Sequence, residues 1–193
     1  MGTDNAQVFV EQDEADRKLK YITDSGETEY SFFFMQLRTP SEHTIDGVRF
    51  GMEIQLYFKE SDNNMAAVAL FADDDAEDKN NNSNFISQLD LENLPNGPTT
   101  SLSIGDVIDQ MPSKTFYSYD GSLTYEPCTE IVRWFVFEEP FFITAAELEA
   151  VESHTGEGYR AFEQLGNRVI LKGAAQILST AMVVVSTVIF TLF

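Results

Sequence analysis

The residues with the clearest chemical character lie within residues 34–60, in two stretches that each alternate in the manner of a β-strand. Gln36 and Arg38 share one face of the first stretch, and Gln55 lies on one face of the second together with Glu53 and Tyr57. If the two strands pair, the guanidinium of Arg38 lies beside the carboxamides of Gln36 and Gln55. The guanidinium can pair with carboxylates or attract a small anion. This set is poorly suited to zinc, because amides are poor zinc ligands and arginine is a permanent cation.

These residues need a sheet to hold them together, and the surrounding sequence predicts one. Strands are expected at residues 30–37, 52–58, 65–71 and 130–137, with edge strands near 8–10 and 21–22. Pro40, Ser41 and the Asp46-Gly47 pair predict turns between the first two strands. A helix is expected over residues 143–152, because Thr144 and Glu147 have the spacing of a capping box.

Several blocks of this sequence resemble α-type carbonic anhydrases. In that family a His-x-His strand is followed by a segment like SEHTIDG, found here at residues 41–47, and then by a Glu-x-His strand. A second block, YDGSLTYEPC at residues 119–128, resembles the family's Tyr-x-Gly-Ser-Leu-Thr-Thr-Pro-Pro-Cys. With the closing segments at 158–160 and 165–168, the resemblance covers roughly residues 5–170 in order.

The resemblance implies that the catalytic zinc site has been altered. The three zinc-binding histidines of the family are replaced by Gln36, Arg38 and Gln55. Because zinc hydroxide is the family's nucleophile, we expect a scaffold without zinc or any other cofactor, and we expect no enzymatic activity. His43 belongs to a segment that is structural in the family, so we expect a hydrogen-bonded core histidine.

Part of the surrounding pocket is expected to persist in vestigial form. The resemblance equates Thr124 with the hydroxyl that orients the zinc-bound hydroxide, Glu42 with its acidic partner, and Glu53 with a carboxylate that orients a ligand histidine. Gln7 stands at the place of the proton-shuttling histidine and cannot titrate near neutral pH.

Two interpretations of Arg38 follow. In the first, Arg38 pairs with Glu53, Glu42 or Glu126 and replaces the charge of the zinc, since a buried arginine needs an acidic partner. In the second, the pocket binds bicarbonate or another small anion. Residual carbonate dehydratase activity with a non-standard metal arrangement is a further alternative.

The end of the chain carries a different signal. Residues 173–193 include no charged side chain, and 21 residues of helix span about 30 Å, the thickness of a bilayer core. A core helix and a lipid-anchor signal are the alternatives. We therefore predict a carbonic-anhydrase-like domain at residues 1–170 and a C-terminal transmembrane helix at 171–193.

The fold class implied by the resemblance is mainly β (α+β), a central twisted and mostly antiparallel sheet with short peripheral helices. The family's N-terminal segment is missing, so we expect a neighbouring chain to cover the surface it leaves. A net charge of −20 argues against nucleic-acid binding. The single cysteine, Cys128, allows no internal disulfide and is expected to be a mostly buried thiol.

Together these features predict a non-catalytic subunit of a membrane protein complex. Its expected partners are the other subunits and, through residues 173–193, the lipid bilayer. Its expected location is an organellar membrane, the mitochondrial inner membrane or the thylakoid, with the C-terminus as a single-pass anchor.

Overall fold

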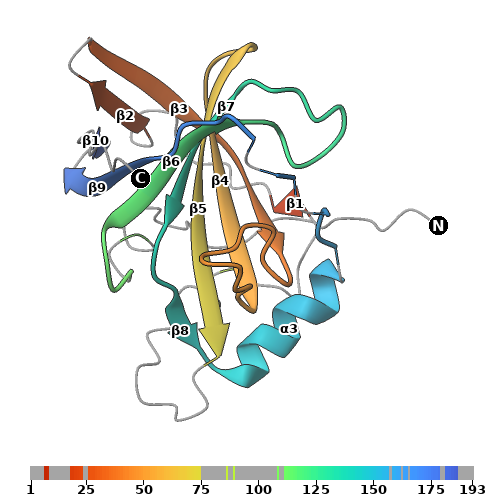
Figure 1. The fold of residues 1–193 in the computed structure, drawn as a ribbon. Coiled ribbons are helices and arrows are strands. Elements are labelled where there is room, and N and C mark those ends of the chain that lie inside the picture. Colours follow the sequence, from red (N-terminus) through yellow and green to blue (C-terminus); the bar gives the residue numbers. More distant parts are fainter. Residues whose placement is uncertain are drawn as a thin grey trace.

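The computed structural model shows a ten-stranded sheet with the helix α3 beside it (Figure 1). The residues that the structure describes are 7–8, 18–23, 26–74, 86, 89, 108, 111–156, 158–161, 163–164, 166–178 and 181–186. The elements are, in chain order, β1 (Gln7–Val8), β2 (Lys18–Thr23), β3 (Gly26–Arg38), β4 (Met52–Ser61), β5 (Asn64–Asp74), β6 (Thr115–Gly121), β7 (Val132–Phe137), β8 (Phe141–Ile143), α3 (Ala145–Thr155), β9 (Leu171–Leu178) and β10 (Ala181–Ser186).

The sheet is mostly antiparallel and curls round on itself. The pairings run from β4 through β5, β7, β6, β9 and β10 to β2, and β2 pairs with β3. Strand β3 also pairs with β4, because its first half lies against β2 and its second half against β4. Parallel pairs occur between β5 and β7, between β5 and β8, and between β10 and β2. The prediction of a mainly β fold with a central, mostly antiparallel sheet is confirmed.

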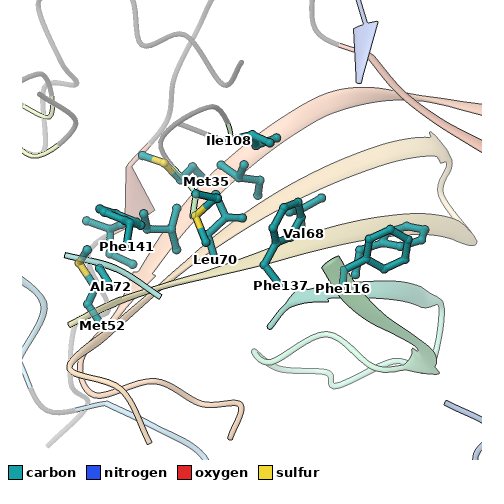
Figure 2. Packing of buried hydrophobic residues seen from close by; sticks show 14 of the residues in the cluster. Met35, Met52, Val68, Leu70, Ala72, Ile108, Phe116, Phe137 and Phe141 are labelled. Atoms are coloured by element: carbon teal, nitrogen blue, oxygen red, sulfur yellow. The ribbon is translucent and has the colours of Figure 1, made fainter. Parts of the chain in front are cut away.

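Both faces of the central strands are buried. One face of β4 and β5 presents Ile54, Leu56, Val68 and Leu70 to a first core, which Figure 2 shows together with Phe137 and other members. The opposite face presents Tyr57 to a second core, described below. Residues 65–72 are at most 5% exposed, so the central strand predicted at 65–71 is confirmed.

Helix α3 begins where its capping box predicts. The backbone N–H of Glu147 donates to Oγ1 of Thr144 at 3.1 Å, and the Glu147 carboxylate accepts from the backbone N–H of Thr144 at 2.8 Å. The helix ends at Thr155, and the C-cap residue Gly156 has a φ of 65°, a conformation that favours glycine. Its Val151 side chain is fully buried in the first core, and Figure 1 shows the helix following β8 near the ends of β4 and β5.

The prediction of a C-terminal transmembrane helix is not what the structure shows. Leu171–Leu178 and Ala181–Ser186 form β9 and β10, and β10 pairs with β9 on one side and β2 on the other. Within the described part of the chain, no helix is both long enough and apolar enough to cross a membrane. The prediction rested on the absence of charged residues, which indicates hydrophobicity but does not distinguish a helix from a strand. The β-branched run Val183–Val185 favours a strand. Residues 187–193 lie outside the described residues.

The edge strand predicted near residues 8–10 falls partly outside the described residues. In the predicted N-terminal edge strand, β1 covers Gln7–Val8 and pairs with β3, so the backbone of Gln7 lies opposite Gln36.

Candidate functional site

The polar residues identified from the sequence lie together on the face of the sheet that also carries Tyr57. The register of β3 and β4 places Gln36 directly opposite Gln55, and Arg38 directly opposite Glu53. Arg38 is 4% exposed, and the other three are fully buried. Strand alternation puts these four side chains on one face, and the antiparallel register brings them side by side.

Gln55 is the most completely bonded of these residues. Its Nε2 donates to Oε2 of Glu42 and to Oε1 of Glu53, both at 2.9 Å. Its Oε1 accepts from the hydroxyls of Tyr57 and Thr124, both at 3.0 Å. A carboxamide has two N–H donors and one oxygen that accepts two bonds, so the Gln55 side chain has all its hydrogen bonds.

Arg38 is held between a carboxylate and a carboxamide. Its Nε lies 3.5 Å from Oε2 of Glu42, whose side chain is 6% exposed. The carboxamide of Gln36 is satisfied when its oxygen faces the guanidinium, where it accepts from Nη2 at 2.5 Å and Nη1 at 3.2 Å. Of the three acidic partners considered from the sequence, Glu42 is the one in contact. The backbone N–H groups of Glu42 and His43 both donate to Glu53, which holds this turn against β4.

A second chain of hydrogen bonds runs through Glu53. Its Oε2 accepts from the backbone N–H groups of Glu42 and His43 at 2.8 Å, and its Oε1 lies 2.7 Å from Nδ1 of His43. The other ring nitrogen of His43 lies 2.6 Å from the Tyr119 hydroxyl. His43 is therefore the hydrogen-bonded core residue that the sequence led us to expect.

The His43–Glu53 contact changes the acidity of both groups. Burial by itself raises the pKa of Glu53, but the charge and hydrogen bonds of His43 outweigh burial and hold that pKa below its usual value. Burial by itself lowers the pKa of His43, but the Glu53 carboxylate outweighs it and raises that pKa above its usual value. Both shifts favour the ion pair. Burial, together with the nearby Glu53 charge, also raises the pKa of Tyr119.

Aromatic rings fill the space beside this network. The Tyr57 side chain is fully buried, and its ring stacks on Phe34 with centroids 4.4 Å apart and planes 12° apart. Tyr125 and Trp134 contact the Tyr57 ring edge-on. The Tyr57 hydroxyl also lies 3.1 Å from Oγ1 of Thr124. The sequence placed Tyr57 on the face of Glu53 and Gln55, but it did not indicate that the ring fills the site.

A pocket of about 410 Å³ lies next to the network. Its lining includes Glu42 and Thr124, the two predicted pocket residues that face open space, and also His43 and Tyr119. Gln36, Arg38, Glu53 and Gln55 do not belong to its lining, because they lie behind these groups. The sequence reasoning missed Tyr119, although its block at 119–128 had been identified.

The residues at the positions equated with zinc ligands do not fit a zinc ion. Both lone pairs of the Gln55 oxygen already accept hydrogen bonds, and the oxygen of Gln36 faces a guanidinium. A cation about 4 Å from Arg38 meets a repulsion of roughly 4 kcal/mol per unit charge at an effective dielectric constant of 20. Elsewhere in the described part of the chain, no cluster of three His, Cys, Asp or Glu side chains could hold a metal ion.

Comparison with known proteins gives the family. The family of eukaryotic-type carbonic anhydrases matches residues 8–172. Carbonic anhydrase 6 of Canis lupus familiaris is 34% identical over 152 residues, which are 67% of this chain and 47% of that protein. Alpha carbonic anhydrase 3 of Arabidopsis thaliana is 26% identical over 170 residues, covering 80% of this chain and 59% of that protein. The chain spans about half the length of carbonic anhydrase 6, the first of these relatives.

A solved structure of a carbonic anhydrase has a similar fold. Carbonic anhydrase Cah3 from Chlamydomonas reinhardtii, in complex with acetazolamide, superimposes with a TM-score of 0.62 at 26% identity, covering 75% of this chain and 66% of that one.

These findings correct the expectation that the chain is not an enzyme. The matching family, the relatives and the solved structure are all carbonic anhydrases, which are enzymes. The prediction was wrong because it took the loss of one set of ligands to decide the class of the whole protein. The match over residues 8–172, with these relatives, shows that the chain belongs to the eukaryotic-type carbonic anhydrase family.

Proposed function

We propose that this member of the carbonic anhydrase family is a subunit of a larger protein assembly, to which its fold contributes shape and fixed charge. The supporting observation is the buried network around Arg38. Arg38 and Gln55 both contact Glu42, and Gln55 also donates to Glu53. A ligand site keeps a few polar groups directed at its ligand, whereas these groups hold β3, β4 and the connecting turn together.

The proposal includes the setting of the assembly. The partners are other subunits of a membrane protein complex, in the mitochondrial inner membrane or the thylakoid, and residues 173–193 are the single-pass anchor of a domain at 1–170. The support is the absence of charge over a length that matches a bilayer core. Because β9 and β10 occupy part of this segment, spanning the bilayer requires these strands to leave the sheet.

Native purification tests the assembly role. An affinity tag at the N-terminus allows isolation in a mild detergent, and native mass spectrometry then gives the particle mass. We expect a mass well above the 21.7 kDa of one chain, with other polypeptides in a fixed ratio. A particle that contains this chain alone contradicts the assembly role. Release of the chain from membranes by alkaline carbonate contradicts the anchor and leaves the assembly role intact.

A second function is favoured by the family and by the pocket. Glu42 and Thr124 line the 410 Å³ pocket, and the relatives are carbonic anhydrases. The candidate activity is hydration of carbon dioxide with a metal site that does not use three histidine ligands. Stopped-flow hydration assays, with metal content measured on the same preparation, test it. A rate above that of Thr124→Val supports the activity, and equal rates contradict it.

The same pocket region is a candidate for binding bicarbonate. Arg38 is a buried cation within the network, where it is paired with Glu42, and it does not line the pocket. Calorimetric titration of bicarbonate into the wild type and Arg38→Ala distinguishes the two interpretations of this residue. Weaker binding to the variant supports an anion site at Arg38, and unchanged binding excludes Arg38 from it.

A further inference from the structure

The 410 Å³ pocket combines apolar walls with cationic and hydroxyl-bearing side chains. Trp134, Val136 and Ile170 supply apolar surface, and Arg160 and Arg168 line the same space. The volume falls within the range of about 300–1,000 Å³ in which proteins bind small molecules. The pocket is therefore large enough for an organic molecule and larger than a single inorganic ion needs.

The hydroxyl of Tyr119 has a proton for which the protein offers no acceptor. Nδ1 of His43 lies 2.7 Å from Oε1 of Glu53, and Nε2 lies 2.6 Å from the Tyr119 hydroxyl. When His43 is protonated, both ring nitrogens donate, so the Tyr119 oxygen accepts from His43. No atom among the described residues then accepts the hydroxyl proton. Because Tyr119 lines the pocket, an acceptor bound there completes its hydrogen bonds.

Two guanidinium groups belong to the same lining. The Cζ atom of Arg168 lies 5.4 Å from the centre of the Tyr119 ring. Nη1 of Arg160 donates to the backbone oxygen of Leu123 at 3.2 Å, and its Nη2 lies 4.0 Å from Oε1 of Glu163. A guanidinium presents its N–H donors in a planar fork that matches a carboxylate. Two such groups near a donating hydroxyl suit a bound anion.

The three acidic side chains of the lining limit the charge of that anion. Oε2 of Glu42 lies 3.5 Å from Nε of Arg38, and Oε1 accepts from the backbone N–H of Arg160 at 3.2 Å, so protein groups engage this carboxylate. Asp46 is exposed and the Glu163 side chain is 75% exposed, where water and salt screen their charges. The net charge of −20 also opposes a highly charged anion. A single negative charge is therefore favoured over two.

We propose that this pocket binds a small organic monocarboxylate with a cyclic or branched apolar body. The carboxylate accepts a hydrogen bond from the Tyr119 hydroxyl and takes its countercharge from Arg160 and Arg168. The apolar body contacts Trp134 and the other apolar walls. The site is independent of the proposed assembly role, and it is separate from the bicarbonate site considered at Arg38, which does not line the pocket.

Binding should weaken as the pH rises. Burial lowers the pKa of His43, and the charge of Arg168 acts in the same direction. The carboxylates of Glu53 and Glu42 act against both, and the net pKa lies above the usual 6.5. Above that raised pKa, Nε2 becomes an acceptor, so the Tyr119 hydroxyl donates to His43 and no longer to the ligand. Burial raises the pKa of Tyr119 itself, so its hydroxyl stays protonated in this range.

Titration of the full chain with cyclohexanecarboxylate tests the site. Trp134 is the single tryptophan of the chain and lines the pocket, so its fluorescence reports binding there, and calorimetry gives the affinity. We expect saturable binding that changes this fluorescence. Acetate lacks the apolar body, cyclohexylmethylamine has the opposite charge, and inorganic phosphate has a higher charge. Each of these three should bind at least about tenfold more weakly.

Variants of the lining identify the contacts. Tyr119→Phe keeps the ring and removes the hydroxyl, so affinity should fall about tenfold and should no longer vary between about pH 6 and 9. Arg160→Gln and Arg168→Gln should each lower affinity about tenfold. The matched controls are Tyr125→Phe and Arg133→Gln, which change residues outside the lining and should bind as the wild type does. Thermal unfolding checks that each variant is folded.

Each outcome decides for or against the site. A preference for the amine or for phosphate contradicts it, as do equal affinity for acetate and the absence of any binding that changes Trp134 fluorescence. Wild-type affinity in Tyr119→Phe, or a wild-type affinity that does not change with pH, also contradicts it. If Tyr119→Phe does not fold, the wild-type pH dependence and Arg160→Gln test the same contacts. A native particle that contains this chain alone overturns the assembly role and leaves the site intact.

Discussion

The Nε atom of Arg38 lies 3.5 Å from Oε2 of Glu42, and both side chains are almost fully buried. The same carboxylate oxygen accepts a hydrogen bond from Gln55 at 2.9 Å. One atom of the turn between β3 and β4 thus contacts a side chain from each strand. Two of the three positions equated with zinc ligands, Arg38 and Gln55, therefore share Glu42 as a partner.

Replacing Arg38 by methionine should lower the free energy of unfolding by about 3–5 kcal/mol, because the change leaves the buried Glu42 carboxylate without its cation. The measurement is urea denaturation followed by tryptophan fluorescence. The matched control is Arg133→Met, whose partner Asp120 is 76% exposed, and it should cost less than about 1 kcal/mol. Equal losses in the two variants contradict a structural role for the Arg38 pair.

The His43–Glu53 pair should make stability depend on pH in a defined window. The Glu53 pKa is lowered by folding, so its contribution is present above 4.5 and is lost as the pH falls through the lower folded value. The His43 pKa is raised by folding, so its contribution is complete below 6.5 and is lost as the pH rises through the higher folded value.

The difference in unfolding free energy between wild type and His43→Gln should therefore be largest between pH 4.5 and 6.5. It should decrease on both sides of that window. Urea denaturation of both proteins at a series of pH values measures it, and the difference removes the effect of the other titrating groups. A difference that stays constant from pH 4 to 9 shows that the pair is not ionised in the folded protein.

Removing the Tyr57 hydroxyl should cost about 1–2 kcal/mol in Tyr57→Phe, since Gln55 and Thr124 both lose a buried partner. Tyr57→Ala should cost about 3–5 kcal/mol, because it also leaves a cavity against Phe34. Thermal or urea unfolding gives both values. Tyr125→Phe, a half-buried neighbour of the same ring, is the control and should change stability by less than about 0.5 kcal/mol. If Tyr57→Phe behaves like the control, the hydroxyl does not hold the network.

Deleting residues 181–193 should expose the edge of β2 that pairs with β10. The backbone amides of residues 19–22 should then exchange with solvent deuterium faster, because their strand loses one neighbour. Hydrogen exchange with mass spectrometry measures the change. Deletion of residues 187–193 keeps β10 and is the control. Unchanged exchange in the longer deletion contradicts the pairing of β10 with β2.

Much of this site could be predicted from local sequence. The period of two in a strand fixes that Gln36 shares a face with Arg38, and that Glu53 shares a face with Gln55. The Thr144 and Glu147 spacing fixed the start of α3, because a capping box is made within one turn of the chain. The order of the blocks at 41–47 and 119–128 indicated the family, which the comparisons confirm.

Tertiary structure decided what these residues touch. Only the register of β3 against β4 sets Gln36 opposite Gln55, and only the fold of the 41–47 turn selects Glu42 as the partner of Arg38 from three acidic candidates. Thr124 reaches Gln55 across a separation of 69 residues. For residues 173–193 the local sequence did not determine the secondary structure, since a lack of charge is compatible with a membrane helix or with strands. Backbone pairing to β2 and β6, which no local pattern reports, made residues 171–178 and 181–186 strands.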